Sequence, residues 1–443
     1  DLAALYDTYE RMPSEKYVSP EIMLKIMLYA YHEGKEISSR TIEKNCKRDI
    51  NYMYLLEGRQ APDHAAIARF RTKHFGKCAN LFLSQMTKIL LELKQLTKTE
   101  VFIDGTKIEA SANKYTFVWK KAVTKHQEKH LRKTALLVGD IIERYGCKPL
   151  WRKQVKKKHV KKLLKQLKIE AEKRELEFVS GRGHRKQQLQ KDIEDLEAAL
   201  QKLKEYETKL HRCGARNSYS KTDHDATFMH MKEDHMMNGQ LKPGYNIQHA
   251  VNSGFIVAAK VFPNPTDVMT LKPFMEQMEA SLQFQFARVV ADAGYESEEN
   301  LVYLRDKGIE AYIKPSNYEQ IGTKKFEKEI GRKENMQYDQ AGDYYICHNG
   351  KRVEKTGVKT RKTASGYLRE ETHYECKDCS GCLCKEKCLA GKNWKKPLEE
   401  RNKKLTVSRL FEEMREEEYR LINSEEGKKL RMNRSIQAEG GFA

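Results

Sequence analysis

Residues 101–110 read VFIDGTKIEA and residues 287–300 read ARVVADAGYESEEN, and these two stretches decide the fold. Each is a short apolar run that ends in an aspartate, Asp104 in the first and Asp292 in the second. A carboxylate at the end of a buried strand is costly unless a partner compensates its charge. One such aspartate is explained by a turn or a helix cap, whereas two in matching settings predict strands that carry both carboxylates to one metal site. Such oxygen ligands suit Mg²⁺, and Glu439 in RSIQAEGGFA is the candidate for a third acid.

Strand-like and helical segments alternate around the second aspartate. Residues 245–262 predict a β-hairpin that turns at an Asn-Ser-Gly sequence. A helix over 267–282, a strand over 287–292, a second helix and a strand over 310–314 follow. Strands separated by helices imply a mixed sheet with parallel neighbours. We therefore expect an α/β fold in which both aspartates lie at the carboxyl ends of strands, where ligands gather.

Other acids are weaker candidates for the site. Asp267 is most simply a helix N-cap, while Asp223 and Asp225 are alternatives that precede a core strand. The acids between residues 412 and 426 lie among charges on every side, as in a solvated helix. Glu439 instead has apolar neighbours and an arginine upstream, which favours it as the third acid.

Residues 1–95 predict a bundle of short helices. A good N-cap and first-turn pair, Ser19-Pro20, begins a helix that stops at Gly34. Further helices are expected over 39–58 and, capped by an aspartate, over 64–75. Such a bundle is typical of helix-turn-helix DNA-binding domains, the alternative being an ordinary bundle with a solvated basic face. The third helix supplies three candidate DNA contacts: Arg69, Arg71 and Lys73.

The segment 120–212 is helical and begins with a strongly basic half. After a Gly-rich break at 180–183, leucines and isoleucines recur in alternating steps of four and three residues from Leu189 to Leu210, which is a heptad seam. The seam predicts a helix that packs antiparallel to the helix before the break. Four basic residues are candidates for phosphate contacts, the alternative being a solvated structural arm: Arg152, Lys156, Lys157 and Lys158.

Six of the ten cysteines crowd between Cys347 and Cys388. Five of them form the pattern C-x-x-C-x-x-C-x-C-x-x-x-C, which contains two overlapping C-x-x-C units. This pattern predicts a structural zinc site that closes a small domain, and six candidates for four positions leave the ligand set open. The alternative is a loop insertion that carries reduced thiols.

The bulk composition indicates a polyanionic partner. The 443 residues carry a formal net charge of +20, and 33% of them are charged. Lysine and arginine release counterions from phosphates, so nucleic acid is the first candidate and an anionic membrane surface the second. The sequence has no long apolar run and no signal-peptide pattern, so we expect an intracellular protein without a membrane partner. The chain begins at Asp1 and ends four residues after Glu439, which we interpret as a fragment of a longer protein.

Two strand-end carboxylates and one helical carboxylate suit a pair of Mg²⁺ ions roughly 3.5–4 Å apart. One ion would activate water or a 3′-hydroxyl, and the other would stabilise the leaving oxygen in an in-line displacement at phosphorus. This chemistry needs no covalent nucleophile, and the serines and cysteines show no nucleophile elbow.

The order of elements and the motifs resemble the insertion-sequence transposases of the DDE type, over nearly the whole chain. VFIDGTKIEA is similar to the first-Asp motif of that family and VVADAGYESEEN to the second. SKTDHDATFMHM followed by GYNIQHAV resembles the lead-in to the second strand, and NRSIQAEGGFA resembles the Arg-x-x-x-x-Glu segment that supplies the third acid. The N-terminal helices are similar to the helical domain that precedes the catalytic core in these enzymes.

The resemblance implies a ribonuclease-H-like core in which Asp104, Asp292 and Glu439 hold Mg²⁺, with Mn²⁺ as a substitute. It implies a homodimer that binds double-stranded DNA, cleaves it at terminal inverted repeats and joins the 3′-hydroxyls to target DNA, in the cytoplasm and on the nucleoid of a prokaryote. It favours one zinc ligand set: Cys347, Cys379, Cys382 and Cys388.

This family usually continues past the third acid, whereas this chain ends at Ala443. The alternative function is therefore an inactive or repurposed transposase fragment that acts only as a sequence-specific DNA-binding protein. The expected domains are a helical DNA-binding domain (1–98), the first strand and hairpin of the core (99–118), a basic coiled-coil-like insertion (119–214), the ribonuclease-H-like core (215–317), a Cys-rich, zinc-binding insertion (318–400) and C-terminal helices that complete the core (401–443).

Overall fold

The structure, a computed structural model, describes residues 1–10, 17–34, 37–147, 155–181, 185–231, 239–389 and 396–440. The chain divides into two compact units. The first consists of Asp1–Gly105, Gln248–Lys260 and Asp267–Ala443, and the second of Thr106–Ile247 and Val261–Thr266. Within the described ranges, no helix combines the length and the apolar character needed to cross a membrane.

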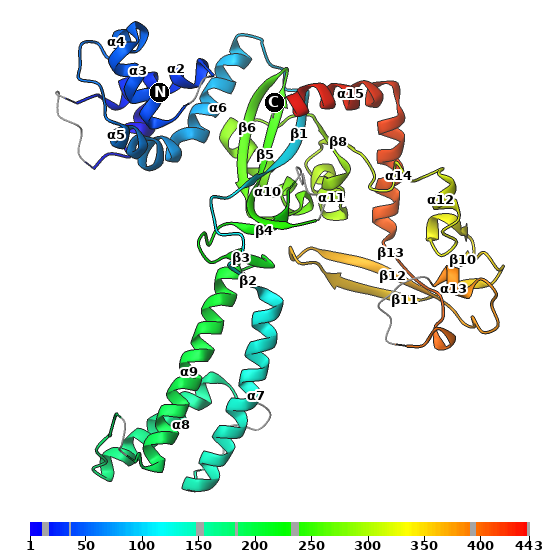
Figure 1. Ribbon diagram of the computed structural model, residues 1–443. Helices are drawn as coiled ribbons and strands as arrows, with labels where there is room; N and C mark the ends of the chain where they lie inside the picture. Colours follow the sequence, from blue (N-terminus) through cyan, green and yellow to red (C-terminus); the bar gives the residue numbers. More distant parts are fainter. Residues whose placement is uncertain are drawn as a thin grey trace. The chain divides into compact units, whose positions relative to one another are not determined.

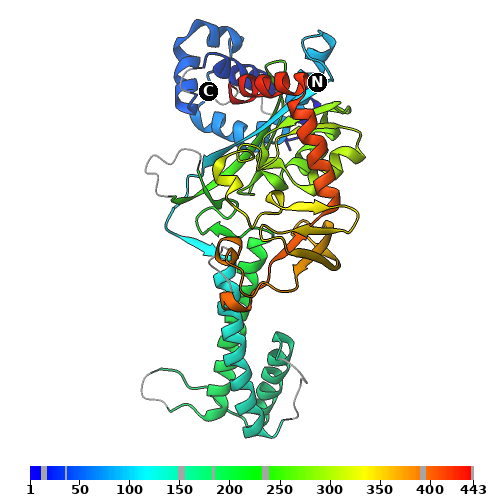
Figure 2. The ribbon, with the colours of Figure 1, turned by 90° about the vertical axis from the view of Figure 1, so that its right-hand side faces the viewer.

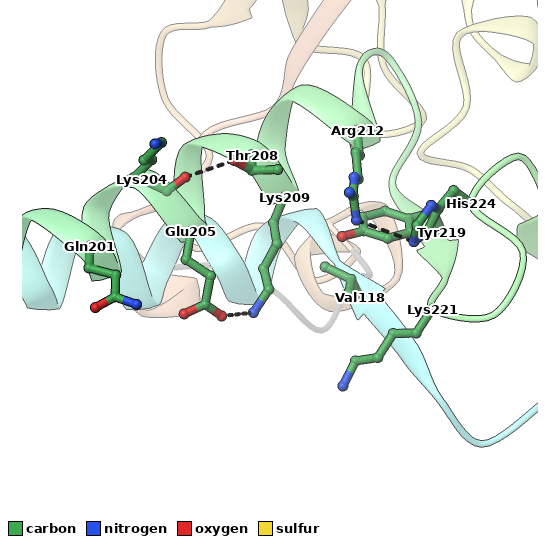
Figure 3. Close-up of a pocket in the computed structure, with 10 residues that line it drawn as sticks. All are labelled: Val118, Gln201, Lys204, Glu205, Thr208, Lys209, Arg212, Tyr219, Lys221 and His224. Carbon is green, nitrogen blue, oxygen red and sulfur yellow. Dashed lines mark hydrogen bonds and ion pairs between the residues drawn. The ribbon is translucent and has the colours of Figure 1, made fainter.

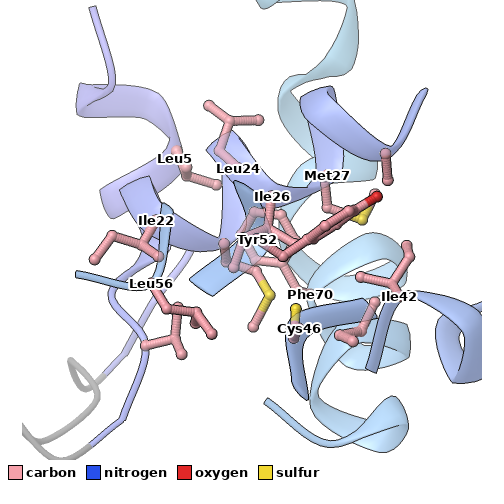
Figure 4. Packing of buried hydrophobic residues seen from close by; sticks show 14 of the residues in the cluster. Leu5, Ile22, Leu24, Ile26, Met27, Ile42, Cys46, Tyr52, Leu56 and Phe70 are labelled. Atoms are coloured by element: carbon pink, nitrogen blue, oxygen red, sulfur yellow. The ribbon is translucent and has the colours of Figure 1, made fainter. Parts of the chain in front are cut away.

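Short helices form the N-terminal part of the first unit. They are α1 (Ala3–Tyr6), α2 (Pro20–His32), α3 (Ser39–Arg48), α4 (Ile50–Leu55), α5 (His64–Arg69), the π-helix η1 (Phe70–Phe75) and α6 (Gly76–Glu92). The predicted caps are present, because Ser19 Oγ accepts the Ile22 N–H at 3.3 Å and Asp63 Oδ1 accepts the Ala66 N–H at 2.6 Å. Apolar side chains from these helices fill one core, as Figure 4 shows.

The single helix predicted over 39–58 is wrong, because this segment forms two helices. Asp49 has an extended backbone that ends α3, and its carboxylate accepts the Asn51 N–H at 2.8 Å and so caps α4. Aspartate competes with the helix for backbone hydrogen bonds, which makes it a better cap than an interior residue. The pattern of apolar residues does not reveal the break between α3 and α4. Cys46 and Tyr52 lie on either side of the break, yet both pack in the same core.

The predicted mixed sheet is present. Its strands are β1 (Glu100–Glu109), β4 (Thr227–His230), β5 (Leu241–Asn252), β6 (Phe255–Phe262), β7 (Arg288–Ala291) and β8 (Glu310–Ile313). Their order is β4-β5-β1-β7-β8, with β6 paired to β5. Strand β7 is parallel to both β1 and β8. The connections are helical, as the alternation predicted: η2 (Asp267–Met269) and α10 (Leu271–Leu282) precede β7, and η3 (Ala293–Tyr295) and α11 (Glu298–Asp306) follow it.

Strand β1 does not end at Asp104, as the sequence suggested, but runs on to Glu109. Its ladder with β7 nevertheless stops at Phe102, which is paired with Val290. The strand continues as the neighbour of β5. Asp104 therefore follows the last β1–β7 pair, although it lies inside a strand.

A second sheet contains part of the cysteine-rich segment. Its order is β13-β12-β11-β10-β9, formed by β9 (Gln337–Asp339), β10 (Tyr344–Ile346), β11 (Arg352–Lys362), β12 (Leu368–Cys376) and β13 (Lys404–Val407). Short helical turns flank these strands: α12 (Lys324–Glu327), η4 (Lys333–Asn335), α13 (Lys385–Cys388) and η5 (Leu398–Glu400).

The helix predicted over 401–423 is wrong in its first part, which is strand β13. Leu405 and Val407 pack with Tyr374 in a small core, while Thr406 between them is exposed. This alternation suits a half-buried strand better than a helix. Helix α14 (Arg409–Asn423) begins only after it, and the expected last helix follows as α15 (Glu425–Gly440).

Three helices and a small two-stranded sheet dominate the second unit. They are α7 (Lys120–Tyr145), α8 (Lys157–Lys173) and α9 (Gln188–Cys213), with β2 (Phe117–Trp119) antiparallel to β3 (Ser218–Ser220). Figures 1 and 2 show α7 and α9 side by side along much of their length. Helix α8 runs antiparallel to α9, as predicted, because Lys157 pairs with Glu207 and Lys168 with Glu197. The third helix, α7, was not foreseen in this packing, and the predicted seam of α9 is buried against both partners.

Candidate active site

Asp104 and Asp292 occupy equivalent positions on two neighbouring parallel strands. The last pair of the β1–β7 ladder joins Phe102 to Val290, and each aspartate lies two residues further along its chain. Side chains alternate between the faces of a sheet, so residues two apart point to the same side. Phe102 and Val290 enter one core cluster together. The two strands thus present their carboxylates next to each other, as the sequence predicted.

Arg434 of helix α15 supplies a cation between these carboxylates. Its Nη2 atom lies 3.1 Å from Asp104 Oδ1 and 3.9 Å from Asp292 Oδ2. The side chains of Arg434 and Asp104 are 15% and 8% exposed, so solvent screens their attraction poorly. Asp292 is more open, with 44% of its side chain exposed. Asp104 is therefore the interior member of the pair and Asp292 the accessible one.

Backbone N–H groups fix the orientation of both carboxylates. The Gly105 N–H donates to Asp104 Oδ1 and the Gly294 N–H donates to Asp292 Oδ1, each at 2.8 Å. Burial raises the pKa of Asp292, and the nearby carboxylates of Asp104 and Asp267 raise it further, whereas Arg434 and the Gly294 N–H lower it. Mutual repulsion of this kind means that a cation stabilises the ionised site.

Asp267 is a third carboxylate next to Asp292, although its sequence context most simply predicted a helix N-cap. A Cβ atom at Gly294 would lie 2.9 Å from Asp292 Oδ1 and 3.3 Å from Asp267 Oδ2, so both acids crowd the same glycine. Gln248 Nε2 donates to Asp267 Oδ1 at 2.9 Å. A Pro-Thr-Asp sequence before a helix usually supplies a helix cap. Nothing in the local sequence distinguishes such a cap from an aspartate that lies next to Asp292 in the folded chain.

Tyr295 completes the surroundings of the acids. Its hydroxyl donates to Gln248 Oε1, and Gln248 in turn holds Asp267. The side chain is fully buried, and burial raises its pKa well above the usual value, with further increases from Asp267, Asp104 and Asp292. Tyr295 is therefore a neutral hydrogen-bond donor that holds the Gln248–Asp267 pair in place.

Glu439 lies near the end of helix α15, and its side chain falls outside the described residues. The preceding residue anchors this end of the helix, because the Ala438 carbonyl oxygen lies 3.2 Å from His249 Nε2 on β5. The same helix carries Arg434 to the aspartates. The proposed role of Glu439 therefore stays a prediction.

The donor set suits a divalent cation, since Asp104, Asp292 and Asp267 offer hard oxygen ligands. Among the residues whose side chains are described, however, no group of three or more His, Cys, Asp or Glu is arranged to hold a metal ion. Arg434 instead provides the compensating charge between two of the acids.

The predicted DNA contacts of the N-terminal bundle separate into two groups. Arg69 and Lys73 line one cavity of about 580 Å³, whose aromatic members include Tyr9, Tyr17 and Phe70. The guanidinium of Arg71 is directed elsewhere and donates from Nη2 to the Ile37 carbonyl at 3.0 Å. Arg69 and Lys73 thus lie on one face of the bundle, whereas the side chain of Arg71 forms a hydrogen bond within the bundle.

The predicted basic residues of the arm are also divided. Arg152 lies outside the described residues. Lys157 forms an ion pair with Glu207 of α9, whereas Lys156 and Lys158 are exposed.

One of the cysteines proposed as zinc ligands, Cys388, is influenced electrostatically by the other three. Burial raises the pKa of the Cys388 thiol, Lys403 lowers it, and the thiols of Cys347, Cys379 and Cys382 raise it further. Cys376 is buried, and its pKa is raised to about 11 by burial and by its hydrogen bond to Cys379. Among the described residues, however, no three of these thiols are arranged to hold a metal ion, so the zinc ligand set stays a prediction.

Comparisons with known families identify the chain. Residues 216–383 and residues 346–443 each match a family model described as a transposase DDE domain, and residues 1–73 match one described as a transposase domain. No curated protein and no solved structure matches the chain. The matched regions contain Asp292, Asp267 and Arg434, and the N-terminal match contains Arg69, Arg71 and Lys73. The chain therefore belongs to the insertion-sequence transposases of the DDE type.

Proposed function

We propose that this protein cleaves DNA at the terminal inverted repeats of its element and joins the 3′-hydroxyl ends to target DNA by metal-dependent phosphoryl transfer. One observation supports this proposal: Asp104 and Asp292 lie at matching positions on neighbouring parallel strands. Each is two residues past the last pair of the β1–β7 ladder. Enzymes of this family use divalent metal ions, and acids so placed bind them.

Asp104, Asp292 and Glu439 are the proposed ligands for Mg²⁺, with Mn²⁺ as a substitute, and Asp267 adds a fourth carboxylate next to Asp292. When bound, the ions supply an activated water or 3′-hydroxyl and charge stabilisation for the leaving oxygen. Backbone N–H groups already orient two of these carboxylates.

Residues around the acids prepare the site. Arg434 offsets the repulsion between Asp104 and Asp292. Tyr295 and Gln248 hold Asp267 through two successive hydrogen bonds. This network fixes the direction of the carboxylate, and preorganised charges of this kind are a main source of catalysis in phosphoryl transfer.

The protein acts as a homodimer, because two element ends have to be brought together. Arg69 and Lys73 of the N-terminal bundle contact double-stranded DNA, which is consistent with their shared cavity. Cys347, Cys379, Cys382 and Cys388 hold a structural zinc ion, which is supported by the zinc-type spacing of the cysteines in the sequence.

An oligonucleotide nicking assay tests the central proposal. The substrate is a duplex that contains the element end, with Mg²⁺ or Mn²⁺, and the variants are Asp104→Asn and Asp292→Asn. We expect specific cleavage by the unchanged chain, loss of cleavage in both variants and retained binding of the duplex. Metal-dependent cleavage that survives in both variants would exclude this site.

A second outcome would favour a different function. Specific binding of the element end without cleavage, by the unchanged chain and with either metal ion, would indicate a protein that only recognises DNA.

A further inference from the structure

A basic groove lies in the second unit, where helix α9 meets the small sheet of β2 and β3. Its volume is about 590 Å³, and Figure 3 shows the side chains that line it. Buried Val118 and Tyr219 provide apolar surface within it, and both belong to one core cluster. The remaining lining comes from one face of α9 and from the segment after β3. The groove thus combines apolar surface with a predominantly cationic lining.

The helical side of the groove follows a regular spacing. Residues 201, 204, 205, 208, 209 and 212 line it, at steps of three and one that keep to one helix face. The twelve residues from 201 to 212 extend for about 16 Å along the helix axis. One strand of B-DNA carries a phosphate for about every 3.4 Å of axis, so this length spans about five phosphate steps.

Charge is segregated along α9. Residues 188–200 carry four acids and one lysine, whereas residues 201–213 carry three lysines and one arginine against two glutamates. The groove lies on the second, basic half. A solvated structural helix needs no such segregation, which concentrates positive charge at one end of the arm.

Three cations of the groove have no carboxylate partner within the described residues. Lys204 and Lys221 are exposed and form no ion pair there, and Arg212 contacts His224 Nε2 at 3.2 Å rather than an acid. Lys209, in contrast, is bound to Glu205. Figure 3 shows both of these contacts as dashed lines. The acid in the groove is therefore already neutralised, and the uncompensated charge is positive.

We infer that this groove holds the phosphate backbone of double-stranded DNA, through Lys204, Arg212 and Lys221. The inference rests on the proposed function, because DNA is the polyanion that a transposase handles. It adds a contact surface in the unit that does not contain the catalytic aspartates. The lining offers cations rather than paired amide groups for base edges, so the contact positions DNA without reading its sequence.

The test measures binding of the full chain to two labelled duplexes, one with the element end and one of unrelated sequence, in EDTA and at several salt concentrations. The test variant carries Lys204→Ala, Arg212→Ala and Lys221→Ala. We expect binding to both duplexes to weaken roughly tenfold or more in 0.1 M salt. The slope of log K against log salt should fall by about 0.9 for each lost phosphate contact, hence by up to about 3.

A matched control removes three cations from the same arm that already have acidic partners. Lys168→Ala, Arg174→Ala and Lys186→Ala remove partners of Glu197, Glu170 and Glu194, and they change the net charge by the same amount. This control should keep the affinity and most of the salt slope. All six side chains are at the surface, and thermal unfolding of both variants verifies that they fold.

The outcomes separate the inference from the proposed function. Equal affinities and slopes in the two triple variants would overturn the inference, and so would a loss confined to the element-end duplex, which indicates base reading. If the chain cuts element ends but gives either of these two binding results, the inference is wrong and the proposed function still holds. If the chain binds DNA through the groove but never cuts it, the inference holds and the proposed cleavage is wrong.

Discussion

Arg434 Nη2 lies 3.1 Å from Oδ1 of Asp104, and the two side chains are largely shielded from solvent. This pair joins helix α15, near one end of the chain, to the first core strand. The same guanidinium lies 3.9 Å from Asp292, so one cation serves two acids. The contact therefore links two distant segments of the fold and places a cation at the proposed metal site.

Replacement of Arg434 with alanine should destabilise the protein and make its stability depend on divalent metal. The buried Asp104 would lose its charge partner, which costs about 3 kcal/mol. Mg²⁺ would then supply the missing charge, so it should raise the Tm of the variant more than that of the unchanged protein. Arg431→Ala is the control. Arg431 is also in α15, but its guanidinium lies over the ring of Tyr318 and does not pair with the aspartates. Equal Mg²⁺ responses in all three proteins would contradict this account.

Gly294→Ala should impair cleavage more than it impairs folding. The added Cβ would lie 2.9 Å from Asp292 Oδ1, so the carboxylate has to move from its place beside Asp267. We expect a destabilisation of about 1–3 kcal/mol and a loss of cleavage of at least tenfold. Gly139→Ala in α7 is the control, since its Cβ meets no atom within 4 Å and should leave cleavage unchanged. Cleavage that persists in Gly294→Ala would show that the position of Asp292 tolerates displacement.

Asp267→Asn should weaken the metal dependence of cleavage rather than DNA binding. The substitution keeps the size of the side chain and the hydrogen bond from Gln248, but it removes one negative charge beside Asp292. The Mg²⁺ concentration for half-maximal cleavage should therefore rise several-fold. Asp225→Asn removes an exposed acid from the second unit and should leave this concentration unchanged. If both variants match the unchanged protein, Asp267 is a structural cap after all.

Glu418 should make the free energy of unfolding fall between pH 5 and pH 8. The pKa of this carboxyl is raised from 4.5 to about 8, mainly by burial and also by the charges of Glu417 and Glu296. The Ile313 N–H donates to the carboxylate at 3.0 Å and lowers the pKa, but by less. Between these values the folded chain binds a proton that the unfolded chain releases. The stabilisation is thus complete below pH 4.5 and is lost as pH rises through 8.

Glu418→Gln tests this directly, because glutamine retains an acceptor for Ile313. Chemical denaturation at several pH values should give a flatter profile for this variant, with higher stability at pH 8. Exposed Glu417→Gln should keep most of the slope. A profile that is unchanged in Glu418→Gln would show that the carboxyl is already ionised at neutral pH.

The purified chain should bind one zinc ion, and Cys388→Ser should release it. Cys388 interacts with three other thiols, whereas Cys384 belongs to the same sequence pattern but lies outside the proposed ligand set. Metal analysis of Cys388→Ser and Cys384→Ser compares the two positions. Loss of zinc from Cys384→Ser alone would refute the ligand set.

Sequence patterns predicted the parts of the fold that depend on local signals. The Ser19 and Asp63 caps, the β5–β6 hairpin and the parallel strands around Asp292 all follow from short-range chemistry. The interruption at Asp49 was missed because the apolar pattern continues through it. Strand β13 was missed because its few residues were read as part of the long charged helix that follows.

The neighbouring positions of Asp104 and Asp292 were predictable because each follows a recognisable apolar run. Asp267 was not, because its role depends on Gln248 and Gly294, which approach it only in the folded chain. The position of Arg434 between two acids is likewise a tertiary property. Its sequence motif indicated a nearby acid but gave no distance to the aspartates.

The site contains residues from three distant parts of the chain, Asp104, Asp267 with Asp292, and Arg434. Ribosomes make these parts in that order. A nascent chain that has not yet received α15 therefore holds its two register-matched aspartates without the cation that offsets them. The two aspartates therefore gain their compensating cation only after α15 has been made, later than the strands that carry them.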